Sequence, residues 1–172
     1  MQMSELLNLD LRLLGVSNRM GISFGFKGQS VEQSCQNSGV DTLTFLLICR
    51  RYAFDALMPG KELLTKVHIP DILNYLKRSH SYYMNIALKD LNHALEKMTE
   101  PCDWRLCHSV WDLYGTYHNE LASHFKYEEE EVFPYVESVL KHEFTQGFSI
   151  RQYGLSHSDV DCRLEKLEKK TS

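Results

Sequence analysis

The sequence contains no long apolar run, and its longest stretch, Phe45–Cys49, is far shorter than the roughly 20 residues that span a lipid bilayer. Basic residues are in deficit, because Lys and Arg number 19 against 23 Asp and Glu and the net charge is −4. Binding to nucleic-acid phosphates usually needs a basic face, so neither nucleic acid nor membrane is an expected partner. The N-terminus has no basic stretch followed by an apolar one, so no signal peptide is predicted.

Paired cysteines are also lacking. The 5 cysteines are odd in number and none stands in a Cys-x-x-Cys motif, which argues against a disulfide scaffold and against a zinc site made of thiolates. We interpret them as reduced thiols and therefore expect a cytoplasmic protein. Glycine-rich phosphate loops of the P-loop or dinucleotide type are absent as well.

What the sequence does contain is a succession of helix signals, with almost no strand signals. Residues 1–60 are predicted to form a small helical domain. A leucine-rich opening helix is followed by a glycine-rich turn at 21–28. Ser30 with Gln33 three residues later predicts a capping box, and Asp41 predicts the start of the next helix.

Residues 61–172 predict longer helices. One helix is expected from 70 to 98, a second from 103 to 140 with a kink or break at Pro134, and a third from 149 to 169. Helices of this length favour an antiparallel bundle. The predicted fold class is therefore all-α, with a helical bundle preceded by the small helical domain.

Apolar residues recur along each long helix at spacings of three and four, which defines a predicted buried stripe. Each stripe also contains a histidine. The first stripe comprises Leu73, Leu76, His80, Tyr83, Ala87, Leu91, Ala94 and Met98; the second comprises Leu106, Val110, Leu113, Tyr117, Leu121, His124, Glu128 and Glu131; the third comprises Ile150, Tyr153, His157, Val160, Leu164 and Leu167.

Four of these residues, His80, His124, Glu128 and His157, predict a metal site in the bundle. His124 and Glu128 stand four residues apart and so share one helix face. Imidazoles with a carboxylate and no thiolate suit iron or manganese, with zinc as a further option. Glu128 has two carboxylate oxygens and is the natural bridge between two metals, which leaves the histidines as terminal ligands.

Each of these residues also has a simpler interpretation. A single histidine on an apolar stripe is usually a hydrogen-bonded core residue, and the run Glu128–Glu131 resembles a solvated face. Three helices that each place a histidine in phase favour the metal site over a metal-free interaction domain. The other histidines are predicted to be surface or supporting residues; they are His68, His93, His108, His118 and His142.

These residues resemble those of the hemerythrin-like (HHE) cation-binding family, and most of all its di-iron proteins that repair iron–sulfur centres. Residues 123–134 look like that family's second-helix signature, and His80 and His157 match its ligands on the first and third helices. The N-terminal part also resembles the small helical domain found ahead of such bundles. Gly25 and Phe26 stand where that domain typically has adjacent cysteines.

The resemblance implies a non-haem di-iron centre. The family has a fourth helix with another His-x-x-x-Glu pair and uses six ligands, whereas this chain supplies four and ends at Ser172. We expect the sequence to be a fragment of a longer protein; completion by another chain, a mononuclear site and an empty site are the alternatives. Apolar faces without a fourth helix predict a homodimer or a swapped dimer.

The resemblance also implies a function. The protein is expected to handle nitric oxide, oxygen or iron, and to repair iron–sulfur client proteins under nitrosative or oxidative stress. The alternative is a gas-sensing or redox-sensing domain of a larger regulator, in which the same site acts on a downstream DNA-binding or signalling module.

Overall fold

The computed structural model describes residues 1–54, 59–100 and 104–142. These residues are helical, and the only extended pairing among them is an isolated bridge between Gln2 and Ser30. The predicted all-α class is therefore confirmed. No helix in the described ranges combines the length and the apolar character that crossing a bilayer requires.

The chain divides into two compact units, Met1–Phe125 and Lys126–Ser172. The helix predicted at 149–169 and the predicted helix cap Asp103 both lie outside the described residues. Elements up to Phe125 are therefore considered together, and those that follow are considered by themselves.

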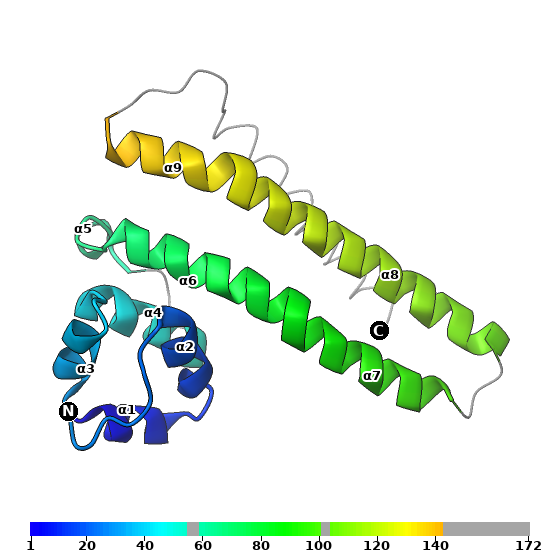
Figure 1. Cartoon of the computed structure of the whole chain (residues 1–172), viewed down its shortest axis with the longest axis horizontal. Helices are drawn as coiled ribbons and strands as arrows, with labels where there is room; N and C mark the ends of the chain where they lie inside the picture. Colours follow the sequence, from blue (N-terminus) through cyan, green and yellow to red (C-terminus); the bar gives the residue numbers. More distant parts are fainter. Residues whose placement is uncertain (55–58, 101–103, 143–172) are drawn as a thin grey trace. The chain divides into compact units, whose positions relative to one another are not determined.

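Four short helices open the first unit (Figure 1). The leucine-rich opening helix of the sequence analysis is in fact two helices. Asp10 has an extended backbone. Its carboxylate accepts hydrogen bonds from the backbone N–H of Arg12 at 2.8 Å and from the Nη2 of the same arginine at 2.6 Å. These contacts separate the first two helices. The bounds are α1 Met3–Leu9, α2 Leu13–Met20, α3 Val31–Asn37 and α4 Thr42–Phe54.

The predicted helix caps at Ser30 and Asp41 are confirmed. The backbone N–H of Gln33 donates to Ser30 Oγ at 3.1 Å, and the backbone N–H of Ser30 donates to Gln33 Oε1 at 3.0 Å. At the start of α4, the backbone N–H and the hydroxyl of Thr44 both donate to Asp41 Oδ1, at 2.8 and 2.6 Å. Gly21 ends α2 in the left-handed conformation with φ 83°, which favours glycine.

These helices enclose an apolar core in which two thiols, Cys35 and Cys49, are buried. Burial raises the pKa of Cys35 to about 11 and that of Cys49 to about 12. Both side chains are therefore neutral packing groups at physiological pH. The buried members of the core are Met3, Leu6, Leu7, Leu13, Val16, Met20, Ile22, Val31, Cys35, Phe45 and Cys49.

Longer helical segments follow. The predicted helix from Pro70 to about Met98 is confirmed, and α8 runs beside it in the opposite direction (Figure 1). Two contacts fix this pairing: Tyr114 Oη donates to the carbonyl of Leu88 at 2.9 Å, and Cys107 Sγ lies 3.9 Å from the carbonyl of Thr99. The bounds are α5 Lys61–Leu64, α6 Ile69–Tyr82, η1 Tyr83–Ala87, α7 Leu88–Thr99 and α8 Trp104–Tyr127, and, after the first unit, η2 Glu128–Val132 and α9 Phe133–Leu140.

Two of these segments, η1 and η2, are π-helical turns. The backbone N–H of Leu88 donates to the carbonyl of Tyr83, and that of Phe133 donates to the carbonyl of Glu128, each spanning five residues. Pro134 lies in the first turn of α9, where its missing N–H costs little. The helix predicted to end or kink at Pro134 does not end there, because the π turn η2 precedes Pro134 and α9 continues through it. The kink itself stays a prediction.

The π turn η1 changes which residues of the first long helix are buried. The predicted stripe is correct up to η1, because Leu73 and His80 are buried. Beyond η1 it is wrong: Leu88 is buried, whereas Leu91 and Met98 are 41% and 56% exposed. A π turn holds one more residue than an α turn, so the buried face moves on by one position.

The predicted stripe of α8 is correct only in part. Val110, Leu121 and His124 are half-buried, but Leu113 and Tyr117 are exposed, and the neighbouring row with buried Cys107 and half-buried Trp111 and Tyr114 is covered instead. The reason is that two neighbouring rows of mainly apolar side chains run along α8, and both repeat every three or four residues. Sequence periodicity alone does not distinguish them.

The first turn of α6 is tied to the N-terminal helices. The backbone N–H of Asp41 donates to Asp71 Oδ2 at 2.7 Å, and the backbone N–H of His68 donates to Thr44 Oγ1 at 2.8 Å. Both sides of the predicted domain boundary near residue 60 thus belong to the first compact unit. The boundary itself stays a prediction.

Candidate metal centre

His80 is the most deeply buried of the predicted ligands. Its side chain lies in the last turn of α6 and the residue is 5% exposed. The imidazole stacks on the ring of Phe125 from α8, with centroids 4.0 Å apart and planes 11° from parallel. The ring therefore points from α6 toward α8, the direction that a bundle site requires.

His124 lies on α8, next to the phenylalanine that covers His80. Its side chain is half-buried, and its ring centroid is 5.9 Å from that of Phe125 at an angle of 47°. His124 directly precedes Phe125 in the chain, so the proximity of these two rings follows from their positions on one helix. His80 contacts Phe125 across the two helices, and both predicted ligands belong to the first compact unit.

Glu128 is the first residue of η2 and is half-buried. It belongs to the second compact unit, so its position is considered by itself. Its carbonyl accepts the hydrogen bond that defines the π turn. His157, the fourth predicted ligand, lies outside the described residues.

Within residues 1–54, 59–100 and 104–142, no group of three or more His, Cys, Asp or Glu side chains is arranged to hold a metal ion. Of the four predicted ligands, the first compact unit contains His80 and His124. The complete ligand set therefore stays a prediction.

Both π turns lie beside predicted ligands. η1 starts three residues after His80, and η2 starts at Glu128, four residues after His124. Single π turns within α-helices are uncommon and are found frequently at functional sites. Their positions therefore mark the same two stretches of helix that the histidine pattern indicates.

Phe125 is a neighbour of His80 that was not predicted, whereas Tyr83 was predicted to lie on the same stripe as His80. The Tyr83 ring lies 6.3 Å from that of Phe125. Burial is the main cause that raises the pKa of Tyr83, so its hydroxyl stays protonated well above neutral pH. Phe125 has no sequence signal of its own, because aromatic residues on a helix most often serve as core packing.

Of the remaining histidines, His142 is exposed, as predicted. His93 and His108 are also exposed, as predicted, and each pairs through Nδ1 with a carboxylate of its own helix, Glu96 at 3.1 Å and Asp112 at 2.7 Å. His118, predicted to be a surface or supporting residue, is half-buried, and its ring lies 6.2 Å from that of Tyr114. Because His118 lies outside the predicted stripe of α8, the sequence did not indicate that its side chain is half-buried.

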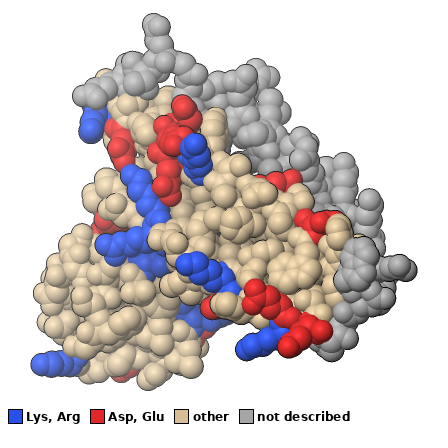
Figure 2. All heavy atoms as spheres, turned by 45° about the vertical axis from the view of Figure 1, so that its right-hand side comes forward, with Lys and Arg blue, Asp and Glu red and all other residues tan. Residues whose placement is uncertain are grey.

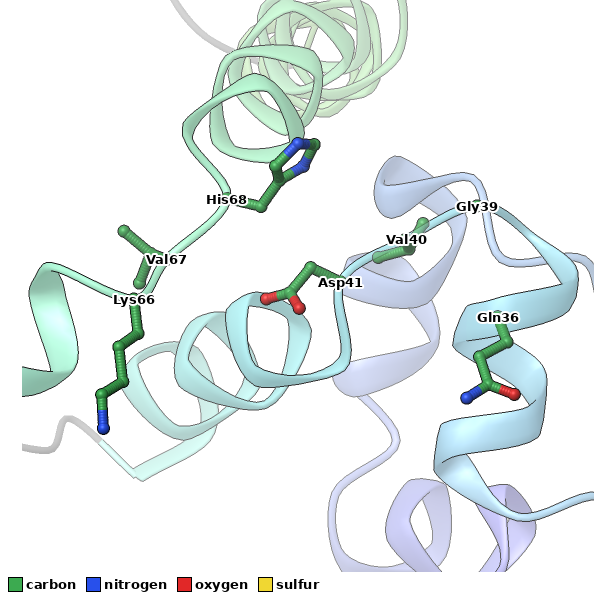
Figure 3. A pocket seen from close by; sticks show the side chains of 7 residues that line it. All are labelled: Gln36, Gly39, Val40, Asp41, Lys66, Val67 and His68. Atoms are coloured by element: carbon green, nitrogen blue, oxygen red, sulfur yellow. The ribbon is translucent and has the colours of Figure 1, made fainter. Parts of the chain in front are cut away.

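His68 is one of the residues that line a separate hollow of about 420 Å³ (Figure 3). His68 Nδ1 lies 3.1 Å from Oδ2 of Asp71, a buried carboxylate that orients the imidazole. Figure 3 shows the side chains coming from α3, from the start of α4 and from the connector before α6. The acid–imidazole pair helps to fix the start of α6, and the described residues here do not form a three-ligand metal site. The lining residues are Gln36, Gly39, Val40, Asp41, Lys66, Val67 and His68.

One catalytic motif occurs by pattern alone. Residues 21–25 spell Gly-Ile-Ser-Phe-Gly, which matches the Gly-x-Ser-x-Gly of serine hydrolases. That motif works in a sharp turn from a strand into a helix. Here it follows α2, and the described residues contain no strand. The match therefore lacks the structure that makes such a serine a nucleophile.

On the face drawn in Figure 2, the described basic and acidic side chains lie among uncharged residues, with no broad surface of one sign. Comparisons with family models, with curated proteins and with solved structures found no match to this chain.

Proposed function

We propose that this protein is a non-haem iron protein whose metal centre lies between α6 and α8, with His80 and His124 among its ligands. The observation that supports this most is the buried imidazole of His80, stacked on Phe125 and directed at the neighbouring helix. A histidine that projects from one helix toward its neighbour is the arrangement by which helical bundles supply metal ligands.

The residues present suit such a centre. His80 and His124 would supply imidazoles from two neighbouring helices, and Glu128, the predicted bridging ligand, has the two carboxylate oxygens that a bridge needs. When bound, iron supplies redox chemistry and a coordination position for a small ligand. Phe125 covers one face of His80, which limits water access and holds the imidazole plane in one orientation.

The finer proposal is a di-iron centre that also includes Glu128 and His157, in a cytoplasmic protein. The resemblance of His80, residues 123–134 and His157 to the hemerythrin-like pattern supports this nuclearity. By the same resemblance, the centre handles nitric oxide, oxygen or iron, and the clients are damaged iron–sulfur proteins. A homodimer is the expected assembly.

The test is anaerobic loading with Fe(II), followed by metal analysis and by near-ultraviolet spectra after exposure to oxygen. We expect bound iron and an oxo-bridge absorption in the wild type. His80→Ala and His124→Ala should reduce iron content by about tenfold or more, because each removes a ligand from a low-coordinate site.

His93→Ala is the matched control, since His93 is an exposed helical histidine paired with Glu96. It should bind as much iron as the wild type. Equal iron content in all four proteins would refute the metal centre and favour a metal-free helical interaction domain. Iron that binds without the near-ultraviolet band would support a mononuclear site.

A further inference from the structure

Arg19, near the end of α2, is a buried cation held by aromatic rings. The residue is 7% exposed, and its Nε has no hydrogen-bond partner. Its guanidinium carbon lies 5.4, 5.4 and 5.2 Å from the ring centroids of Tyr52, Tyr75 and Tyr82, and Nη2 donates to Tyr75 Oη at 3.2 Å. We refer to these four residues as the arginine cage.

The arginine cage is a specific contact and not general packing. A buried guanidinium is costly unless its charge is compensated, and the faces of three tyrosines provide that compensation. Burial alone would lower the pKa of Arg19, but the hydrogen bonds to Tyr75 and Tyr52 leave it raised. The charge is therefore retained, and the contact depends on the rings keeping their places around it.

The cage joins three helices, because Tyr52 belongs to α4 while Tyr75 and Tyr82 belong to α6. Tyr75 and Tyr82 are seven residues apart and share one face of α6. His80 points about 150° away from them around the helix axis. α6 therefore presents one face to the N-terminal helices and the opposite face, with His80, to α8 (Figure 1).

A series of ring contacts also connects the cage to His80. The rings of Tyr82 and Tyr83 meet edge to face at 5.6 Å. The Tyr83 ring then contacts Phe125 at 6.3 Å, and Phe125 stacks on His80 at 4.0 Å. A displacement of Tyr82 is thus transmitted through two rings to the imidazole, in addition to any shift of the helix itself.

We propose that the arginine cage positions His80. Arg19 draws one face of α6 against α2 and α4, and this contact sets how far and at which angle the opposite face presents the imidazole to α8. The N-terminal helices then act as a support for the metal centre, with Arg19 as a positioning residue. The inference rests on the proposed function only where His80 is taken as a ligand, because the ring position is measurable without metal.

The first experiment uses the metal-free protein. Stacking on Phe125 shifts the imidazole proton signals of His80 away from those of an exposed histidine such as His93, and NMR of the ring protons reports this. In Arg19→Met, which keeps a long side chain but removes the charge, we expect the His80 signals to move toward the exposed values. Arg19→Lys keeps a cation above the rings and should restore part of the shift. Arg50→Met removes an exposed arginine of α4 and should change nothing.

The second experiment measures Co(II) binding by its visible absorption, which reports ligand geometry. Arg19→Met should weaken Co(II) binding by about tenfold and change the spectrum, as expected when a residue that orients a ligand is lost. Tyr82→Leu interrupts the ring contacts while Arg19 remains, and it should shift the His80 signals in the same direction. It provides the test if Arg19→Met does not fold.

Unchanged His80 ring signals in both Arg19→Met and Tyr82→Leu would overturn the positioning role, whatever the metal data show. If the wild type binds no Co(II) through His80, the proposed function fails, and the ring signals still decide whether the cage positions His80. If Co(II) binds through His80 but identically in Arg19→Met, the metal centre stands and the arginine cage does not set its ligand geometry.

Discussion

Asp41 makes the stability of the folded protein depend on pH through the hydrogen bonds at the start of α4. Its carboxylate accepts two hydrogen bonds from Thr44, whose hydroxyl is the main cause that lowers the pKa of Asp41; burial opposes this shift and the backbone N–H of Thr44 adds to it. A lowered pKa in the folded state means that the ionised form contributes stability. That contribution is complete above the ordinary carboxyl value near pH 4 and is lost as pH falls through the lowered value.

Asp41→Asn tests this dependence. Asparagine still caps a helix, so only the charge is removed, and we expect a loss of about 1 kcal/mol or less at pH 7. The difference in unfolding free energy between the two proteins should shrink below pH 4 and vanish below the folded pKa. Urea unfolding between pH 2.5 and pH 7 measures it. Asp90→Asn, which removes an exposed aspartate of α7, should show no comparable change; a constant Asp41→Asn difference at all pH values would contradict the prediction.

The buried thiols of Cys35 and Cys49 allow a second test on single residues. Because burial raises their pKa to about 11 and about 12, the thiolate fraction at pH 8 is lowered by about 100-fold or more relative to a free cysteine. Iodoacetamide should therefore modify both at least about 100-fold more slowly in the native protein than in urea, as followed by peptide mass spectrometry. Comparable rates in the two conditions would mean that the N-terminal core opens readily.

Helix ends could be predicted from the sequence because they depend on local hydrogen bonds. Ser30 with Gln33, and Asp41 with Thr44, each act within three residues, and their patterns are visible in the sequence. The π turn at Tyr83–Ala87 has no such local signal. It depends on which faces the two flanking segments bury, so the stripe predicted beyond His80 was wrong by one position.

Removing Asn85 tests this account of η1. The residue is exposed, and a π turn shortened by one residue becomes an α turn, which leaves the flanking helices in their present orientations. The faces with His80 and Leu88 then stay buried, and we expect the unfolding free energy to change by less than about 1 kcal/mol.

The control removes Asn92 from the regular helix α7. Every later residue of that helix then rotates by about 100°, which turns Leu95 away from its half-buried position and should cost about 2 kcal/mol or more. Urea unfolding followed by circular dichroism compares the two. If both deletions lower the unfolding free energy equally, η1 does not arise from one extra residue in an otherwise α-helical segment.

The candidate site could be predicted only in part, since its members come from distant segments. The buried position of His80 followed from helical periodicity, which requires only neighbours along the chain. Its contact with Phe125, and the contact of Arg19 with Tyr75, join residues more than 40 positions apart. Such contacts are created by tertiary packing, and a single sequence contains no direct signal for them.

Metal binding should therefore stabilise the N-terminal helices as well as the helices around His80. A ligand that binds only the folded protein stabilises it by about 2.7 kcal/mol at 100 times its dissociation constant. Since α2 and α6 are joined through Arg19 and Tyr75, this stabilisation should slow amide hydrogen exchange in Leu13–Met20 as well as in Ile69–Tyr82 when Co(II) is added. In His80→Ala, Co(II) should leave exchange unchanged in both helices. Slowing confined to α6 and α8 in the wild type would mean that the N-terminal helices open independently, because a shared cooperative unit has a common opening free energy.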